Sequence, residues 1–219
     1  MAKYRAILFD LDGTLLDTLE DLADSVNMIL GKYGFAKRNQ AEIRGFLGNG
    51  SEKLMRAALP EKIEPEKFAS YLEEYKAYYG MHMEEKTEPY AGIPELLEEL
   101  QRAGLQIGVV SNKFDMAVKR LCEKYFPENI HAAAGERETE GIRRKPAPDM
   151  LLSVADELGA KAQDCLYVGD SEVDILTAEH AGMDCVSVAW GFRDEEFLKK
   201  AGATHVVHTP EELKKWILC

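Results

Sequence analysis

The stretch Ala6–Thr18, AILFDLDGTLLDT, decides the fold of this 219-residue chain. Its first residues belong to an expected strand, Arg5–Phe9, which begins one residue before the stretch. The unbroken apolar run in this strand is typical of a strand buried on both faces of a sheet. Two aspartates, Asp10 and Asp12, follow at once. Like charges two residues apart repel each other and are costly to desolvate without a partner. Folding does not need such a pair, so we expect it to bind a cation or take part in a reaction.

The overall charge of the chain excludes several classes of partner. Lys and Arg number 27 and Asp and Glu number 39, which gives a net charge of −12. Proteins that bind DNA, RNA or anionic membranes without sequence preference need a basic surface. We therefore expect no nucleic-acid or membrane partner. A small anionic ligand is still possible, because the local field of a site can oppose the global charge.

Features that would direct the chain out of the cytoplasm are missing from the sequence. The four cysteines have no CxxC spacing and are consistent with a reducing compartment; they are Cys122, Cys165, Cys185 and Cys219. The N-terminal segment MAKYRAILFD lacks the layout of a signal peptide, since its apolar run is short and ends in acid. No segment approaches the roughly 20 apolar residues that span a bilayer. We expect a cytoplasmic location.

Short apolar runs alternate with helical patterns along most of the chain. The expected strands are Arg5–Phe9, Gln106–Val110, His131–Ala134, Cys165–Val168, Cys185–Val188 and His205–Val207. The expected helices, with apolar residues at a period near 3.6, are Gly92–Ala103, Asp115–Tyr125, Asp149–Leu158, Glu172–Ala181 and Pro210–Ile217. Repeated strand–helix units predict an α/β fold with a Rossmann-like parallel sheet and helices on both faces.

One segment departs from this alternation. From Asp17 to about Thr87 the sequence shows helical patterns and no convincing strand. We therefore predict a helical cap domain at residues 17–87, inserted into an α/β core domain made of residues 1–16 and 88–219. An insert of about seventy residues is large enough for a small helical bundle.

Polar residues follow several of the expected strands. Ligands of open α/β sheets bind at the carboxyl ends of the strands, so we expect these residues to converge at one edge. They are Asp10 and Asp12, then Ser111, Asn112 and Lys113, then Arg144 and Lys145 ahead of a later helix, and finally Asp170 and Asp174.

These residue types match the needs of phosphoryl transfer. Asp10, Asp170 and Asp174 offer the hard oxygen ligands that Mg²⁺ prefers. Asp10 can attack phosphorus, and Asp12 can protonate the leaving group and later activate water. Ser111 can donate a hydrogen bond to a phosphoryl oxygen.

Two further residues complete this interpretation of the site. Lys145 can offset the negative charge that Asp10 shares with the phosphate. Gly13 permits a close backbone approach that a side chain would hinder.

Four motifs in this order, DLDGTLLDT, VVSNK, KPAPD and GDSEVD, resemble those of the haloacid dehalogenase superfamily. The helical insert resembles the C1 cap of that family. The resemblance implies that Asp10 is the nucleophile and Asp12 the general acid/base. It also implies that the backbone carbonyl of Asp12 joins Asp10, Asp170 and Asp174 around the metal. Dehalogenase members lack the second acid, so Asp12 favours phosphatases and mutases.

Within the family, the chain resembles the phosphoglycolate phosphatases. The segments FLGNGSEKLMRAAL (residues 46–59), SNK and AWGFR (residues 189–193) carry this likeness. It implies an Mg²⁺-dependent phosphatase that acts on a small phosphorylated metabolite through an aspartyl-phosphate. The residues expected to contact substrate or phosphate are Gly13, Thr14, Asn112, Lys113, Gly48, Asn49 and Gly50.

Three alternatives remain open at this stage. A sugar phosphomutase of the β-phosphoglucomutase type would use the same intermediate, and a pyrophosphatase group shares the architecture. A phospho-acceptor switch that resembles a response-regulator receiver also has acids, a hydroxyl and a lysine at strand ends, but such domains are shorter and lack a helical insert. The chain could be a monomer or a homodimer.

Overall fold

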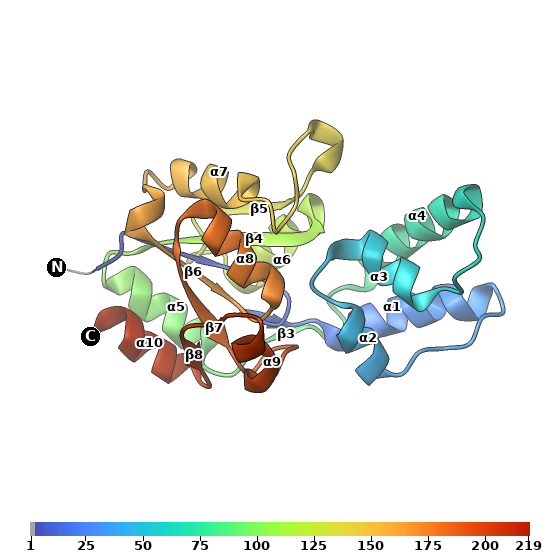
Figure 1. Ribbon diagram of the computed structural model, residues 1–219, viewed down its shortest axis with the longest axis horizontal. Coiled ribbons are helices and arrows are strands. Elements are labelled where there is room, and N and C mark those ends of the chain that lie inside the picture. Colours follow the sequence, from blue (N-terminus) through green and yellow to red (C-terminus); the bar gives the residue numbers. More distant parts are fainter. Residues whose placement is uncertain (1–2) are drawn as a thin grey trace.

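The computed structural model describes residues 3–219, and a six-stranded sheet forms the centre of its larger lobe (Figure 1). All strands are parallel, in the order β5-β4-β1-β6-β7-β8. Their bounds are β1 Ala6–Phe9, β4 Gln106–Phe114, β5 Ala132–Glu136, β6 Cys165–Gly169, β7 Asp184–Val188 and β8 Val206–Val207. The Rossmann-like α/β core expected from the sequence is confirmed.

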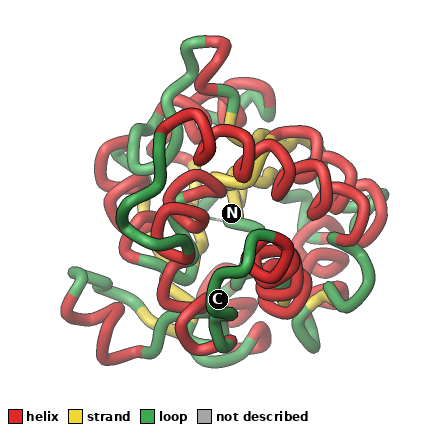
Figure 2. The backbone as a smooth tube through the Cα atoms, turned by 90° about the vertical axis from the view of Figure 1, so that its right-hand side faces the viewer, coloured by secondary structure: helices red, strands yellow, loops and turns green. Residues whose placement is uncertain are grey.

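Helices cover both faces of this sheet, and Figure 2 shows the strands lying between them. They are α5 Ile93–Arg102, α6 Asp115–Tyr125, α7 Asp149–Glu157, α8 Glu172–Ala181, α9 Glu195–Lys200 and α10 Pro210–Leu218. Successive side chains of a strand point to opposite faces. Ile7 and Phe9 accordingly join the core beneath α5, α6 and α10, whereas Ala6 and Leu8 join the core beneath α7 and α8. The unbroken apolar run of β1 follows from this two-sided burial.

The strand that precedes the SNK motif is longer than the sequence predicted. We expected it to end at Val110, but β4 continues to Phe114, which pairs with Glu136 of β5 beyond an irregularity in register. Ser111–Lys113 therefore lie within the end of this strand rather than after it. The six-residue helix α9 was not predicted, because it spans fewer than two turns and shows little periodicity.

A second lobe, here called the cap lobe, consists of α1 Leu19–Lys32, α2 Gln40–Phe46, α3 Gly50–Ala58 and α4 Pro65–His82 (Figure 1). These helices lie inside the predicted segment 17–87. Of the expected substrate-contacting residues Gly48, Asn49 and Gly50, the first two precede α3 and Gly50 is its first residue. Within residues 3–219, no helix is both long and apolar enough to cross a membrane.

The two chain segments that join the lobes pair with each other. Leu16–Asp17 (β2) and Glu88–Pro89 (β3) form a short antiparallel ribbon, which the sequence did not reveal. Beside it the buried carboxylate of Asp21 accepts hydrogen bonds from the N–H groups of Lys86 and Thr87 and from the Thr87 hydroxyl. The entering and leaving segments are thus fixed to one another at the base of the cap lobe.

Reciprocal arginine contacts hold the cap lobe against the sheet edge. Arg44 of α2 donates hydrogen bonds to the carbonyls of Gly191 and Phe192 in the core. Arg193 in turn donates to the carbonyls of Arg44 and Leu47 in the cap lobe. We call these four bonds the arginine latch. They close the cap lobe over the carboxyl end of the sheet.

Candidate active site

Asp10 lies directly after β1 and is almost fully buried. Its backbone N–H donates to the carbonyl of Val168 on the neighbouring strand, which extends the parallel pairing by one residue. One carboxylate oxygen, Oδ1, accepts a hydrogen bond of 2.7 Å from the Leu11 N–H and lies 3.0 Å from the Lys145 ammonium. Within residues 3–219 no hydrogen bond engages the other oxygen, so Asp10 retains a free lone pair for a ligand.

Three buried carboxylates meet at this point. Asp10, Asp170 and Asp174 each place one oxygen within 4.8 Å of the others. Asp170 follows β6, and its oxygens accept hydrogen bonds from the Phe192 N–H at 2.6 Å and the Thr14 hydroxyl at 3.4 Å. The acid cluster predicted from two distant motifs, DLDGTLLDT and GDSEVD, is therefore present at one edge of the sheet.

Gly13 makes room for Asp170. Its φ of +84° lies in the left-handed region that favours glycine. A Cβ built there would collide with the Asp170 carboxylate and with the ring of Phe192. The expected role of Gly13 in close backbone approach thus has a specific basis, namely contact with an acid of the cluster.

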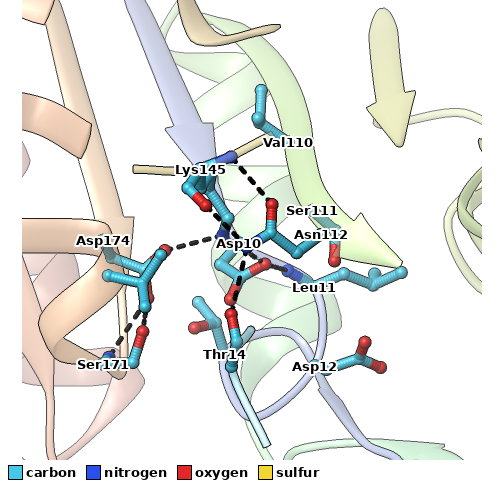
Figure 3. Close-up of polar contacts among 12 residues, drawn as sticks. Asp10, Leu11, Asp12, Thr14, Val110, Ser111, Asn112, Lys145, Ser171 and Asp174 are labelled. Atoms are coloured by element: carbon cyan, nitrogen blue, oxygen red, sulfur yellow. Dashed lines mark hydrogen bonds and ion pairs between the residues drawn. The ribbon is translucent and has the colours of Figure 1, made fainter. Parts of the chain in front are cut away.

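Lys145 is the cation closest to these acids. Its ammonium lies 3.0 Å from Asp10, 2.7 Å from Asp174 and 3.0 Å from the hydroxyl of Tyr167. Figure 3 shows Asp174 between Lys145 on one side and Ser171 on the other. Each Asp174 oxygen accepts two hydrogen bonds: Oδ1 from Lys145 and Tyr167, and Oδ2 from the N–H and hydroxyl of Ser171. This carboxylate is oriented more tightly than those of Asp10 and Asp170.

The acids outnumber the cation, and their pKa values reflect it. Burial, together with the charges of Asp174 and Asp12, raises the pKa of Asp10 to about 7 despite the attraction of Lys145. Burial and the charges of Asp174 and Asp10 also raise the pKa of Asp170 well above its usual value. Burial alone would lower the pKa of Lys145, but Asp10 and Asp174 outweigh it and raise that pKa.

The site accordingly suits a divalent cation. Three carboxylates and one ammonium leave two uncompensated negative charges in a buried pocket when all are ionised. All the side-chain donors are hard oxygens, the type that Mg²⁺ and similar ions prefer.

Asp12 lies on the opposite side of the β1 loop from Asp174, as Figure 3 shows. Its Oδ1 accepts a 2.7 Å hydrogen bond from the Thr18 hydroxyl and lies 3.0 Å from the ammonium of Lys113. Its side chain is 19% exposed, whereas that of Lys113 is only 3% exposed. Asp12 is therefore the more accessible of the two side chains, and the ammonium of Lys113 is buried beside it.

Asn112 links three segments through its side-chain amide. The amide oxygen accepts a hydrogen bond of 2.8 Å from the N–H of Lys145. The NH₂ group donates at 3.1 Å to the carbonyls of Lys145 and Gly48. This side chain thus fixes the lysine segment and the cap loop, and its expected contact with substrate stays a prediction.

A small cavity lies between the two lobes, with a volume of about 40 Å³. Its lining includes seven of the predicted residues: Asp10, Asp12, Gly48, Gly50, Ser111, Asn112 and Lys113. Leu22, Leu47, Leu54, Tyr75 and Tyr79 of the cap lobe also line it and were not predicted, and Ser51 of the GNGS segment completes the lining. Thr14 and Asn49 do not line it: Thr14 contacts Asp170, and Asn49 accepts a hydrogen bond from Lys53 on its own helix.

Sequence reasoning also missed Tyr167 and the arginine latch. Tyr167 is a buried strand residue whose hydroxyl contacts Lys145, Asp174 and the carbonyl of Val110. The one available signal was a polar hydroxyl inside the apolar run CLYVG, because a buried tyrosine hydroxyl normally has a partner. Nothing in the local sequence indicated that Arg44 donates hydrogen bonds to the carbonyls of Gly191 and Phe192.

A parallel sheet flanked by helices, with buried aspartates and a lysine at its carboxyl edge and an inserted helical lobe above it, is the arrangement of an enzyme that acts on phosphoryl groups. The chain matches the family model described as haloacid dehalogenase-like hydrolase over residues 7–188. The chain belongs to this family.

Relatives with curated names lie close to it in sequence. A phosphoglycolate phosphatase of Xanthomonas campestris pv. campestris is 35% identical over 196 residues, which cover 86% of this chain and 85% of that protein. An N-acetylmuramic acid 6-phosphate phosphatase of Pseudomonas aeruginosa is 30% identical over 220 residues, covering 96% and 93%. The predicted phosphatase class is thereby confirmed.

Among solved structures, one from Lactobacillus delbrueckii subsp. bulgaricus, described as a candidate phosphoglycolate phosphatase, has a TM-score of 0.92 with this fold. It is 38% identical, and the match covers 100% of this chain and 99% of that one. The arrangement of cap lobe and core is therefore common to both proteins.

Proposed function

We propose that this phosphatase hydrolyses phosphoglycolate, or a phosphomonoester of similar size, through an aspartyl-phosphate on Asp10. The observation that carries the proposal is the position of Asp10, which lines a small cavity between the lobes together with Asp12. The predicted substrate-binding and catalytic roles given below are part of this proposal.

Mg²⁺ is the proposed cofactor. The carboxylates of Asp10 and Asp170 and the backbone carbonyl of Asp12 would hold it, with Asp174 contributing directly or through water. When bound, the ion supplies positive charge that compensates the buried carboxylates and the phosphoryl oxygens. The predicted cytoplasmic location and a monomeric or homodimeric state remain predictions.

Asp10 is the proposed nucleophile. A carboxylate oxygen of Asp10 forms a bond to phosphorus while the bond from phosphorus to the leaving oxygen breaks. Asp12 donates a proton to that oxygen, so that a neutral alcohol departs. In the second half-reaction, Asp12 takes a proton from water as the water attacks phosphorus. The bond between phosphorus and Asp10 breaks, which releases inorganic phosphate and restores the Asp10 carboxylate.

Two core residues are proposed to stabilise the transferred group. Ser111 is buried and lines the cavity, and its hydroxyl can donate to a phosphoryl oxygen. Lys145 approaches Asp10 from behind and compensates the charge that develops as the phosphoryl group arrives. Tyr167 and Asp174 fix the lysine ammonium in this position.

The size and lining of the cavity favour a small acid as the rest of the substrate. Its volume of about 40 Å³ is small. Gly50 and Ser51 line it from the start of α3, where no side chain caps the helix N–H groups. A helix N-terminus favours an anion, so this wall suits a carboxylate better than a sugar ring.

A substrate panel with purified full-length protein tests the proposal. We expect phosphate release from phosphoglycolate with Mg²⁺ and almost none after chelation, whereas N-acetylmuramic acid 6-phosphate and hexose phosphates should react poorly. Asp10→Asn should abolish turnover while the circular dichroism spectrum is retained. Faster turnover of the amino sugar phosphate would contradict the substrate assignment, and isomerised hexose phosphate without free phosphate would indicate a mutase.

A further inference from the structure

Lys113 carries a buried positive charge, and the mechanism proposed above gives this residue no role. Its side chain is 3% exposed, and its one ion-pair partner among residues 3–219 is Asp12, at 3.0 Å. A buried charge without a partner is costly, so this contact is important to both residues. Lys113 also lines the cavity, and we had predicted that it contacts substrate or phosphate.

The second contact of the Lys113 ammonium comes from the cap lobe. It donates a hydrogen bond of 2.7 Å to the hydroxyl of Tyr79, which belongs to α4. Tyr79 is itself held on both sides: its ring stacks on Tyr75 of the same helix and meets Phe114 at the end of β4 edge to face. Burial and the charge of Asp12 raise the pKa of Tyr79 well above its usual value, which keeps the phenol neutral.

The geometry points to a positioning role: Lys113 couples the position of the cap lobe, through Tyr79, to the orientation of Asp12. This inference rests on the proposed function, because it concerns the residue proposed as general acid/base. Both Thr18 and Lys113 contact Oδ1 of Asp12. No hydrogen bond in residues 3–219 engages Oδ2, which leaves that oxygen for proton transfer.

Movement of the cap lobe would change this arrangement. Tyr79 leaves Lys113 whenever α4 moves away from the sheet edge, and water then reaches the ammonium. A solvated ion pair is much weaker than a buried one, so the hold on Asp12 weakens. The closed cap lobe therefore adds the buried Lys113 contact to the hold that Thr18 has on Asp12, which links proton transfer to exclusion of water.

The test compares two leaving groups of almost equal size. Ethyl phosphate releases a strongly basic alkoxide that needs a proton, whereas acetyl phosphate releases weakly basic acetate that does not. In both, kcat/KM reports the steps up to attack by Asp10. We expect Lys113→Met to lower kcat/KM for ethyl phosphate by about 10- to 100-fold, because a misplaced general acid loses much of its effect. The loss for acetyl phosphate should stay within about threefold.

Tyr79 provides the second variant and tests the coupling itself. Tyr79→Phe removes one oxygen and keeps the ring, so it should fold even where Lys113→Met does not. We expect it to lower kcat/KM for ethyl phosphate by about 3- to 10-fold and to cause no further loss when Lys113 is already Met. Tyr78→Phe on the same helix, where the ring stacks on His82, is the matched control and should behave as the unchanged protein.

Several outcomes would overturn the inference. Equal losses for ethyl and acetyl phosphate would assign Lys113 to the phosphoryl group. A loss confined to phosphoglycolate would assign it to the carboxylate of that substrate. Additive losses for Tyr79 and Lys113 would mean that the tyrosine acts independently. If the unchanged protein hydrolyses none of the three compounds, the proposed function fails and the coupling fails with it.

Discussion

The carboxylate of Asp10 is buried beside two other acids, and this burial determines how the protein responds to pH. Its pKa rises from 3.8 to about 7, chiefly because burial penalises the charged form. In the unfolded chain the same group ionises near its ordinary pKa. Between these two values the folded state binds a proton that the unfolded state does not, so folding is favoured at the acidic end of this range.

We predict that the chelated protein loses stability as the pH rises through about 7, the pKa of Asp10 in the folded protein. Where the two states differ by one proton, each pH unit lowers the free energy of unfolding by about 1.4 kcal/mol. Melting temperatures measured with a chelator should show this fall, and Asp10→Asn should make it shallower, leaving the part that Asp170 contributes. Mg²⁺ should raise the melting temperature more at high pH than at low pH. A chelated protein with the same pH dependence as its Asn variant would contradict the pKa shift.

We predict that Gly13→Ala disrupts the acid cluster, because the new Cβ would displace Asp170. Gly34→Ala is the matched control: its φ of +74° imposes a similar backbone strain, but no atom lies within 4 Å of the added Cβ. Both variants should lose about 1–2 kcal/mol of stability from that strain. Only Gly13→Ala should also lose the Mg²⁺-dependent rise in melting temperature. An intact response to Mg²⁺ in Gly13→Ala would separate Gly13 from the proposed metal site.

At the level of elements, periodicity was sufficient to predict most of the core. Asp115–Tyr125 and Glu172–Ala181 have the predicted bounds, and the strands begin or end within a few residues of theirs. The failures are physical in origin. β4 gains residues through pairing with β5 across an irregular register, and the β2–β3 ribbon joins two segments that the whole cap lobe separates in the sequence.

The candidate site likewise contains residues that could be predicted from the sequence and residues that could not. The acids, Ser111 and Lys145 were predictable because each matches a family motif, and Asp10, Ser111 and Asp170 also lie at or directly after the end of a strand. The structural role of Asn112 could not be predicted, because its hydrogen-bond partners Lys145 and Gly48 are 33 and 64 residues away in the sequence. One sequence shows which side chains are available, but hydrogen bonds between distant segments depend on how the elements pack.

For the molecule as a whole, the position of the cap lobe governs access to Asp10. The arginine latch joins α2 to the segment that also supplies the Phe192 N–H to Asp170. Closure of the cap lobe and support of the acid cluster therefore share one short stretch of backbone.

We predict that Arg44→Met weakens closure, because the latch loses its two bonds to the core. Small-angle X-ray scattering should give a larger radius of gyration, and KM for phosphoglycolate should rise about 3- to 10-fold, as expected when one or two hydrogen bonds are lost. Arg56→Met, which removes a surface pair with Glu52, is the control and should change neither quantity. An unchanged radius with a raised KM would mean that Arg44 does not act through closure.

The bonds from Lys86 and Thr87 to Asp21 have a consequence for how this architecture can diversify. Because both crossings are tied together at one point, the four helices beyond it form a single insert that enters and leaves the α/β core at one place. Substitutions at the cap-lobe wall of the cavity can change which molecules are admitted while Asp10, Asp170 and Asp174, which all lie in the core, keep their positions. Tyr79 is the exception, since a change there would alter selectivity and the hold on Asp12 together.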